Sequence, residues 1–155
     1  SAWRRQKTTY FLGMKTMVHR ELLEDLAAVE EEIQHRMRRD RELARFVESL
    51  VRIEGYNYRR VDRTATLSNH AFGIALDFLP RSYGGRQVYW RWAYDSGLAW
   101  HSIPADQRFS VPDSFVEAFE LYGFVWGGKW RFYDVIHFEY RPEILMLNGF
   151  DVRLR

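Results

Sequence analysis

Cysteine is absent from the 155-residue sequence, which excludes disulfide bonds and metal sites built from thiolates. This absence does not exclude an exported protein. No apolar run approaches the roughly 18 residues that a membrane span requires, and no signal peptide is recognisable. The sequence begins at Ser1 without an initiator methionine, so we expect that a leader or an anchor has been removed from the natural chain.

A surplus of charge of one sign is also missing, because 23 basic and 21 acidic side chains leave a formal charge of only +2. This balance argues against a nucleic-acid partner, which a strongly basic chain would favour. Apolar residues are plentiful instead, at 46% of the chain, and aromatic residues make up 17%. A chain of this length buries about two-thirds of its unfolded surface, so we expect a single domain over residues 1–155, present as a monomer.

Helical periodicity dominates the first third of the chain. Apolar residues recur at helical spacing from 19 to 37, and again from 41 to 51. Residues 1–18 show no clear period. We therefore expect residues 1–50 to form a helical N-terminal part.

Shorter elements follow, because the period of the pattern changes after residue 50. Strands are predicted at 51–61, 73–78, 124–126 and 135–140. Helices are predicted at 88–97, 111–123 and 142–147. Leading helices followed by mixed strands and helices favour an α+β fold, in which the N-terminal helices pack on a small, mainly antiparallel sheet.

The segment "SNHAFGIALDF", residues 68–78, holds a histidine and an aspartate seven positions apart. In one straight strand, His70 and Asp77 would lie roughly 23 Å apart, at about 3.3 Å per residue. No single partner could contact both side chains at that separation. Either the two residues are unrelated, or the chain bends near Gly73 and brings them together.

A third candidate, His137, lies in the apolar strand pattern "DVIHFEY". Two imidazoles and one carboxylate form a ligand set that suits Zn²⁺, and three protein ligands leave a fourth position for water, as in catalytic sites. A nearby carboxylate would then act as a general base towards that water. A core histidine with a hydrogen bond and an aspartate at a strand end would give the same pattern, so both interpretations stay open on spacing alone.

A resemblance to a known family favours the metal site over the hydrogen-bonded core histidine. "SNHAFGIALDF" resembles the S-x-H-x-x-G-x-A-x-D signature of VanY-type zinc D-alanyl-D-alanine carboxypeptidases and of the related phage L-alanyl-D-glutamate endopeptidases. "YGFVWGGKWRFYDVIHFEY" resembles the second block of that family, in which a carboxylate precedes the last metal histidine by three residues. "GYNYRRV" is similar to the segment that supplies a substrate-facing arginine. The three blocks occur in the order of the family.

The resemblance implies a zinc site formed by His70, Asp77 and His137, within a catalytic core at residues 51–155. It implies that the chain hydrolyses stem peptides of bacterial peptidoglycan. Asp134 would be the base that activates the attacking water and later protonates the leaving amine. An aspartate there is typical of the endopeptidase group, whereas the carboxypeptidases usually carry glutamate.

Other residues receive supporting roles. Arg59 aligns with the arginine that stabilises the developing oxyanion or binds a substrate carboxylate, with Arg60 and Arg63 as the alternatives. Ser68 would orient the substrate or the first metal ligand. Trp126 or Trp130 would form a wall of the cleft, with packing as the alternative for both. Glu139 is a rival base, although support of the metal ligands suits it better.

Two alternatives remain. The chain could be a noncatalytic, zinc-containing domain that binds the cell wall, although the intact Asp134 and Arg59 argue against it. The aromatic stretch around Trp92 could stack on sugar rings, but helical spacing leads us to expect that it covers a sheet. The presumed substrate implies an exported protein in the periplasm or at the cell surface, with a phage lysin acting from the cytoplasm as the alternative.

Overall fold

The computed structural model describes residues 2–155. Its α-helices are α1 (Leu23–Met37), α2 (Arg41–Ser49), α3 (Trp90–Asp95), α4 (Asp113–Glu120) and α5 (Pro142–Leu147). Its strands are β1 (Gln6–Phe11), β2 (Met14–His19), β3 (Leu50–Glu54), β4 (Ala75–Pro80), β5 (Phe124–Trp126) and β6 (His137–Tyr140). None of the described helices is long and apolar enough to cross a membrane.

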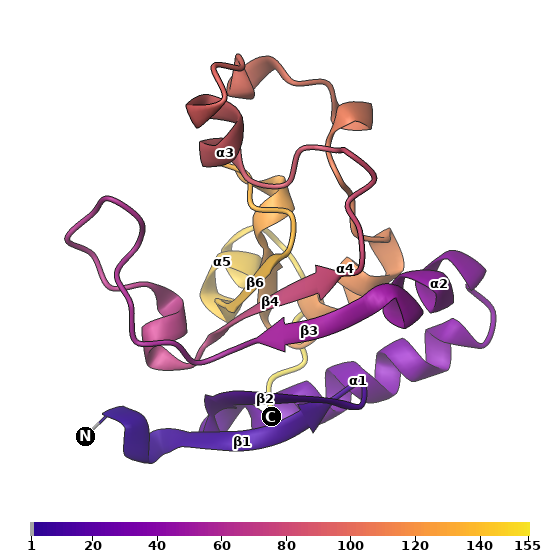
Figure 1. Cartoon of the computed structure of the whole chain (residues 1–155). Helices are drawn as coiled ribbons and strands as arrows, with labels where there is room; N and C mark the ends of the chain where they lie inside the picture. The colour runs from indigo at the N-terminus through magenta and orange to yellow at the C-terminus, as the bar shows by residue number, and fades with distance from the viewer. Residues whose placement is uncertain (1) are drawn as a thin grey trace.

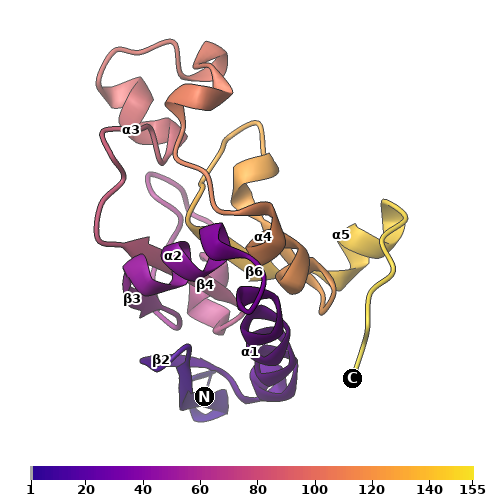
Figure 2. The same cartoon turned by 90° about the vertical axis from the view of Figure 1, so that its right-hand side faces the viewer.

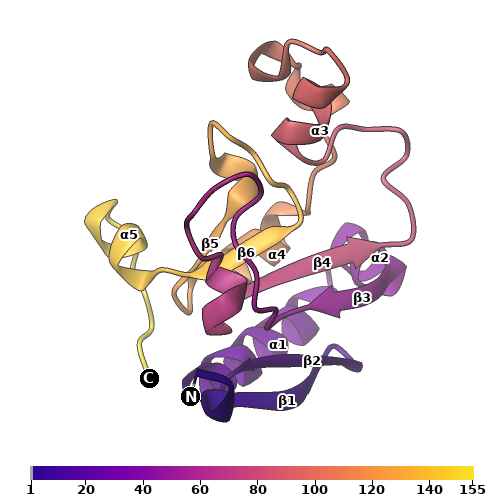
Figure 3. The ribbon, with the colours of Figure 1, turned by 60° about the vertical axis from the view of Figure 1, so that its left-hand side comes forward.

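The predicted α+β class is confirmed. A four-stranded antiparallel sheet in the order β3-β4-β6-β5 forms the centre of the molecule, and a separate hairpin of β1 and β2 lies beside it (Figures 1 and 3). The strand at 73–78 and the helix at 111–123 are confirmed as β4 and α4. The strand expected at 51–61 is shorter than predicted and ends at Glu54.

One face of the sheet packs on helices, because alternate residues of its central strands are large and apolar. Phe78 of β4 has no exposed surface, and its ring contacts those of Phe11, Phe115, Phe119 and Phe138. These rings come from β1, α4 and β6, and buried apolar residues of α1 and α2 complete the same core. The residues that alternate with them must face the other way, and that opposite face carries the polar site described below.

The expectation of a helical N-terminal part over residues 1–50 is wrong in its first part, where the sequence shows no clear period. Residues 6–19 form a hairpin instead, with a two-residue loop in which Leu12 and Gly13 both have positive φ values, 49° and 77°. A loop of this kind matches the twist of an antiparallel pair. The sequence hides these strands for two reasons. β1 buries only its first and last residues, and β2 buries alternate residues but places the polar Thr16 inside and the apolar Met17 outside, so no apolar period is visible.

Strand β2 of the hairpin contacts Gly55, the residue that follows β3, and the contact leaves no room for a side chain at Gly55. The Tyr56 N–H donates to the carbonyl of Met17 over 2.6 Å. A Cβ atom built on Gly55 would lie 2.1 Å from the same Met17 oxygen, which is backbone and cannot rotate away. Gly55 is therefore required for the close approach of β2, and its own carbonyl accepts a hydrogen bond from His70.

We expect Gly55→Ala to lower the free energy of unfolding by about 2 kcal/mol or more, because the added methyl group overfills a packed contact. The measurement is chemical denaturation of both proteins. Gly84→Ala is the control: nothing lies within 4 Å of a Cβ at that position, although its φ is +61°. The control should lose only about 1 kcal/mol, the cost of a left-handed residue. Equal losses in the two variants would contradict this account of Gly55.

Helix α3 and the loops around it lie at the end of the molecule opposite α1 and the hairpin, as two views agree (Figures 1 and 2). The helix predicted at 88–97 is thus confirmed, but its expected packing is wrong. Trp92 does not cover the sheet, because 55% of its surface is exposed. The consequence of that exposure is taken up below.

Candidate metal centre and active site

Strand register explains why residues 60 positions apart in the sequence meet. Asp77 of β4 lies directly opposite His137 of β6, and Glu54 of β3 is its partner on the other side. Directly opposed residues of an antiparallel pair have Cβ atoms about 5 Å apart on the same face. Asp77 and His137 therefore point together from the face of the sheet that lies opposite the phenylalanine core.

His70 reaches the same point because the chain bends where the sequence predicted a bend. Residues Asn69–Phe72 form a short 3-10 turn that begins with Ser68, whose Oγ accepts from the N–H of His70 over 3.3 Å. Gly73 ends the turn with a φ of +72°, and β4 starts two residues later. A Cβ there would lie 2.7 Å from the backbone nitrogen of His19, so Gly73 is needed for both its conformation and its small size.

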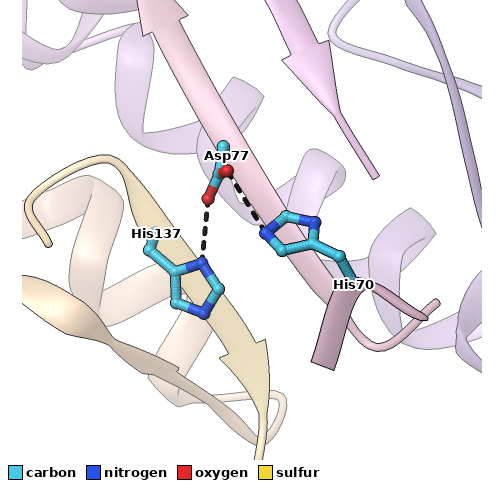
Figure 4. Close-up of side chains that lie close together, drawn as sticks. All are labelled: His70, Asp77 and His137. Carbon is cyan, nitrogen blue, oxygen red and sulfur yellow. Dashed lines mark hydrogen bonds and ion pairs between the residues drawn. The ribbon is translucent and has the colours of Figure 1, made fainter. Parts of the chain in front are cut away.

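The three predicted ligands form one buried cluster (Figure 4). Each offers a nitrogen or oxygen atom, and these atoms all lie within 4.8 Å of one another. His70 Nε2 lies 3.2 Å from Asp77 Oδ2, and His137 Nδ1 lies 2.8 Å from Asp77 Oδ1. The arrangement could hold a metal ion, as the ligand types suggested.

The hydrogen bonding of His70 favours a cation. Its Nδ1 lies 2.7 Å from the carbonyl oxygen of Gly55, which can only accept, so Nδ1 carries the hydrogen. In the neutral ring Nε2 then has a bare lone pair, and this fully buried atom makes no hydrogen bond. Neither Nε2 nor the facing carboxylate of Asp77 has a hydrogen to share. A divalent ion between them would satisfy both, and a backbone carbonyl on the far nitrogen is the usual support of a metal-binding histidine.

The carboxylates of Asp77 and Glu139 on either side of His137 favour its protonated form. Burial lowers the pKa of His137, but hydrogen bonds to Asp77 and Glu139 outweigh burial and raise the pKa to about 10. Burial raises the pKa of Asp77, yet the hydrogen bond from His137 and the close imidazole of His70 hold that pKa well below its usual range. The cluster thus keeps an anionic carboxylate that attracts a cation, and metal binding would displace the proton of His137.

Glu139 supports His137 from behind. Its Oε2 lies 3.0 Å from His137 Nε2, the ring nitrogen that faces away from Asp77, and it accepts a 2.7 Å hydrogen bond from Asn69. Burial raises the pKa of Glu139, but the hydrogen bonds to His137 and Asn69 hold it below its usual range. An anionic carboxylate on the second nitrogen of a histidine ligand fixes its orientation, which is the supporting role expected for Glu139.

Asp134 lies in the segment that leads into β6. Its backbone N–H donates to Gly127 over 3.0 Å, and a Cβ on Gly127 would lie 2.5 Å from the carbonyl oxygen of Asp134. The glycine thus allows the close approach that brings this segment beside His137. Burial raises the pKa of Asp134 to about 6, and the nearby His137 opposes that rise. A carboxylate with such a pKa is able to accept a proton near neutral pH.

A cavity of about 820 Å³ opens onto the cluster. Asp134, Arg59, Ser68 and Trp130 all line it, together with the three cluster residues. The tryptophan ring lies 5.5 Å from the imidazole of His137, centre to centre. The structure therefore brings the three predicted metal ligands, the predicted base and the first-choice substrate-binding residues to one cavity.

The three candidate arginines differ in where they reach. A guanidinium nitrogen of Arg59 lies 3.8 Å from Asp77 Oδ2, at the edge of the cluster. Arg60 instead donates to the backbone of Ala65, and Arg63 pairs with Asp95. Only Arg59 of the three lines the cavity, so it alone is positioned to contact a molecule bound beside the cluster.

Sequence reasoning missed one part of this cavity. Trp90, Trp92 and Phe132 also line it. Trp90 and Trp92 belong to α3, which lies at the end of the molecule away from the N-terminal hairpin (Figure 1). The tryptophan-rich stretch is the signal for it. Stacking on sugar rings is one interpretation of that stretch, and its helical spacing favours the other, packing against a sheet. The spacing of these residues does not indicate where α3 lies relative to the sheet, and α3 lies apart from it.

The comparisons with known proteins give one match. Residues 62–140, about half of the chain, match a family model described as D-alanyl-D-alanine carboxypeptidase. The matched segment contains His70, Asp77, Asp134 and His137, whereas Arg59 lies just before it. No curated protein and no solved structure matches the chain.

Proposed function

Because this chain belongs to the D-alanyl-D-alanine carboxypeptidase family, we propose that it is a zinc-dependent enzyme that hydrolyses stem peptides of bacterial peptidoglycan. The family is one of peptidases, so the chain belongs to the hydrolases. One observation carries the proposal: the buried cluster of His70, Asp77 and His137 opens onto a large cavity that also contains Asp134. A structural metal site would instead be closed on all sides.

Zinc held by the cluster would supply a Lewis acid that lowers the pKa of a water molecule towards neutrality. Asp134, as the general base, would take a proton from that water and pass it to the amine that leaves. Its raised pKa suits both steps, because the group must gain and lose a proton near neutral pH. Glu139 would keep the imidazole of His137 in the orientation that binds the metal.

The remaining residues would position the substrate. Arg59, whose side chain is 44% exposed, is free to bind a carboxylate of the stem peptide or the oxyanion that develops during attack. Ser68 acts through the turn that carries His70 and borders the cavity. Trp130 forms a wall beside His137 and would exclude water from one side of the reacting bond.

Which bond is cleaved decides between two activities. The family match favours a D-alanyl-D-alanine carboxypeptidase, whereas the aspartate at position 134 favours an L-alanyl-D-glutamate endopeptidase. Both activities are compatible with a cavity of this size. We propose the endopeptidase. The identity of residue 134 is given more weight than the family description, because that residue is the base of the catalytic site itself.

The test is digestion of purified muropeptides with the zinc-loaded protein, followed by mass spectrometry. The endopeptidase predicts release of the stem peptide after its first residue, and the carboxypeptidase predicts loss of one terminal alanine. Muropeptide binding without any product after long incubation would contradict an enzyme and support the noncatalytic wall-binding alternative. Because the substrate lies outside the cytoplasm, we also propose an exported protein, which detection of the mature chain in the periplasm or at the cell surface would test.

A further inference from the structure

The cavity holds an aromatic surface that the proposed peptidase chemistry does not use. Trp90, Trp92 and Phe132 line the cavity together, and we call them the aromatic platform. Trp92 is 55% exposed and Phe132 is 51% exposed. Exposed aromatic side chains that border a binding cavity indicate a contact surface rather than a core.

The rings of the platform are held in place by their neighbours. Phe132 stacks on Trp100 with 5.0 Å between ring centres and an angle of 26° between the planes. The same phenyl ring lies 4.9 Å from Trp90, and Trp92 contacts Tyr89 edge-on at 5.8 Å. Side chains that are already held in place lose little conformational entropy when a ligand stacks on them. The aromatic platform is therefore preorganised for binding.

The backbone ties the platform to the catalytic segment. Tyr89 forms an isolated antiparallel bridge with Asp134. The Trp90 N–H donates to Tyr133, and the Val135 N–H donates to Val88, both over 3.0 Å. Trp90 therefore follows directly after Tyr89, the residue that pairs with the proposed base Asp134. A ligand on the platform would be held next to the reacting bond.

The substrate contains only one group that is complementary to flat aromatic faces. Stem peptides offer methyl groups, a linear alkyl amine and carboxylates, none of which has a flat apolar face to stack. The glycan strand to which they are attached offers pyranose rings with apolar C–H faces and polar edges. Two guanidinium groups lie near the platform. The guanidinium carbon of Arg91 is 4.4 Å from the ring centre of Trp90, and that of Arg131 is 5.9 Å from the ring centre of Phe132. Both groups could donate hydrogen bonds to the acetyl and hydroxyl oxygens of a sugar.

We propose that the aromatic platform is a saccharide subsite that binds an N-acetylated sugar ring of the peptidoglycan strand. The identity of the sugar rests on the proposed function, because peptidoglycan is the substrate inferred there. A sugar bound beside Asp134 would bring the first bonds of the stem peptide to the metal centre. The subsite thus favours cleavage near the glycan over cleavage of the terminal residue.

Binding of peptide-free glycan strands tests the subsite without any requirement for hydrolysis. The dissociation constant would be measured by NMR titration of the full chain, for the wild type, Trp92→Ala, Phe132→Ala and Trp92→Phe. We expect each alanine variant to weaken binding by about 10-fold, as loss of an anchoring aromatic ring does, and Trp92→Phe to retain most of the affinity. Tyr10→Ala is the matched control, because Tyr10 is 66% exposed but does not line the cavity.

Kinetics give a second readout. With stem peptides linked to the disaccharide, the two alanine variants should lose about 10-fold in kcat/KM, and with free stem peptides they should match the wild type. Failure of the wild type to bind glycan strands, unchanged binding in the variants, or equal losses on both substrates would each overturn the subsite. If the protein hydrolyses neither substrate, the proposed function fails, while the binding measurement still decides the question of the subsite.

Discussion

Asp134→Asn is expected to lower kcat by about 10³-fold while the metal stays bound. A positioned general base contributes about 10² to 10⁴-fold to a hydrolysis, and an amide cannot accept the proton that Asp134 would take. The side chain is not part of the His70, Asp77 and His137 cluster, so its replacement should leave metal affinity nearly unchanged. If the Asp134→Asn protein keeps its metal, its lower kcat results from the missing base and not from a damaged metal site.

The measurement is steady-state hydrolysis of muropeptides combined with metal analysis of the same sample. Asp134→Glu is the conservative variant and should restore part of the activity, because it keeps a carboxylate one methylene further from the backbone. Glu139→Gln tests the rival base. It should retain catalysis but bind metal about 10-fold more weakly, since Glu139 contacts His137. An active Asp134→Asn protein would remove Asp134 from the mechanism.

Asp77→Asn should abolish both metal binding and activity. The carboxylate of Asp77 lies between the two imidazoles, 3.2 Å from His70 and 2.8 Å from His137. An amide of the same shape carries no charge and offers a weaker ligand, so the site would lose its only anionic member. We expect the metal content to fall from about one equivalent to near zero.

Thermal unfolding with and without added zinc gives an independent measurement. Zinc at about 1,000 times its dissociation constant should stabilise the wild type by about 4 kcal/mol, which raises the midpoint by roughly 10 °C. The Asp77→Asn midpoint should not respond. Glu54→Gln is the matched control, because Glu54 is the cross-strand partner of Asp77 and lines the same cavity. If Asp77→Asn binds zinc as the wild type does, the assigned ligand set is wrong.

Much of the candidate site could be predicted from the sequence because its constraints are local. The glycine between His70 and Asp77 indicated a bend, and the alternation of β4 indicated that Asp77 faces away from the apolar residues of the strand. Both follow from the chemistry of a few neighbouring residues. The meeting with His137 depends instead on strand register over 60 residues, and only the family resemblance supplied it.

Features that depend on tertiary contacts were not predictable. In the hairpin at 6–19, β1 buries too few residues to show a strand period, and β2 buries the polar Thr16 while it exposes the apolar Met17. The exposure of Trp92 depends on where α3 lies relative to the sheet, and helical spacing is the same for a covered and an uncovered face. Arg59 was chosen by alignment, and its distance to Asp77 and its position in the cavity wall separate it from Arg60 and Arg63.

We propose that two imidazoles and one carboxylate bind a catalytic zinc ion. The most direct measurement is a crystal structure of the zinc-loaded protein, with anomalous diffraction recorded at the zinc absorption edge. We predict one strong peak about 2.0–2.2 Å from His70 Nε2, from a carboxylate oxygen of Asp77 and from the His137 nitrogen that faces it. A zinc-soaked crystal with no peak between these residues, or with a peak only at other side chains, would contradict the account.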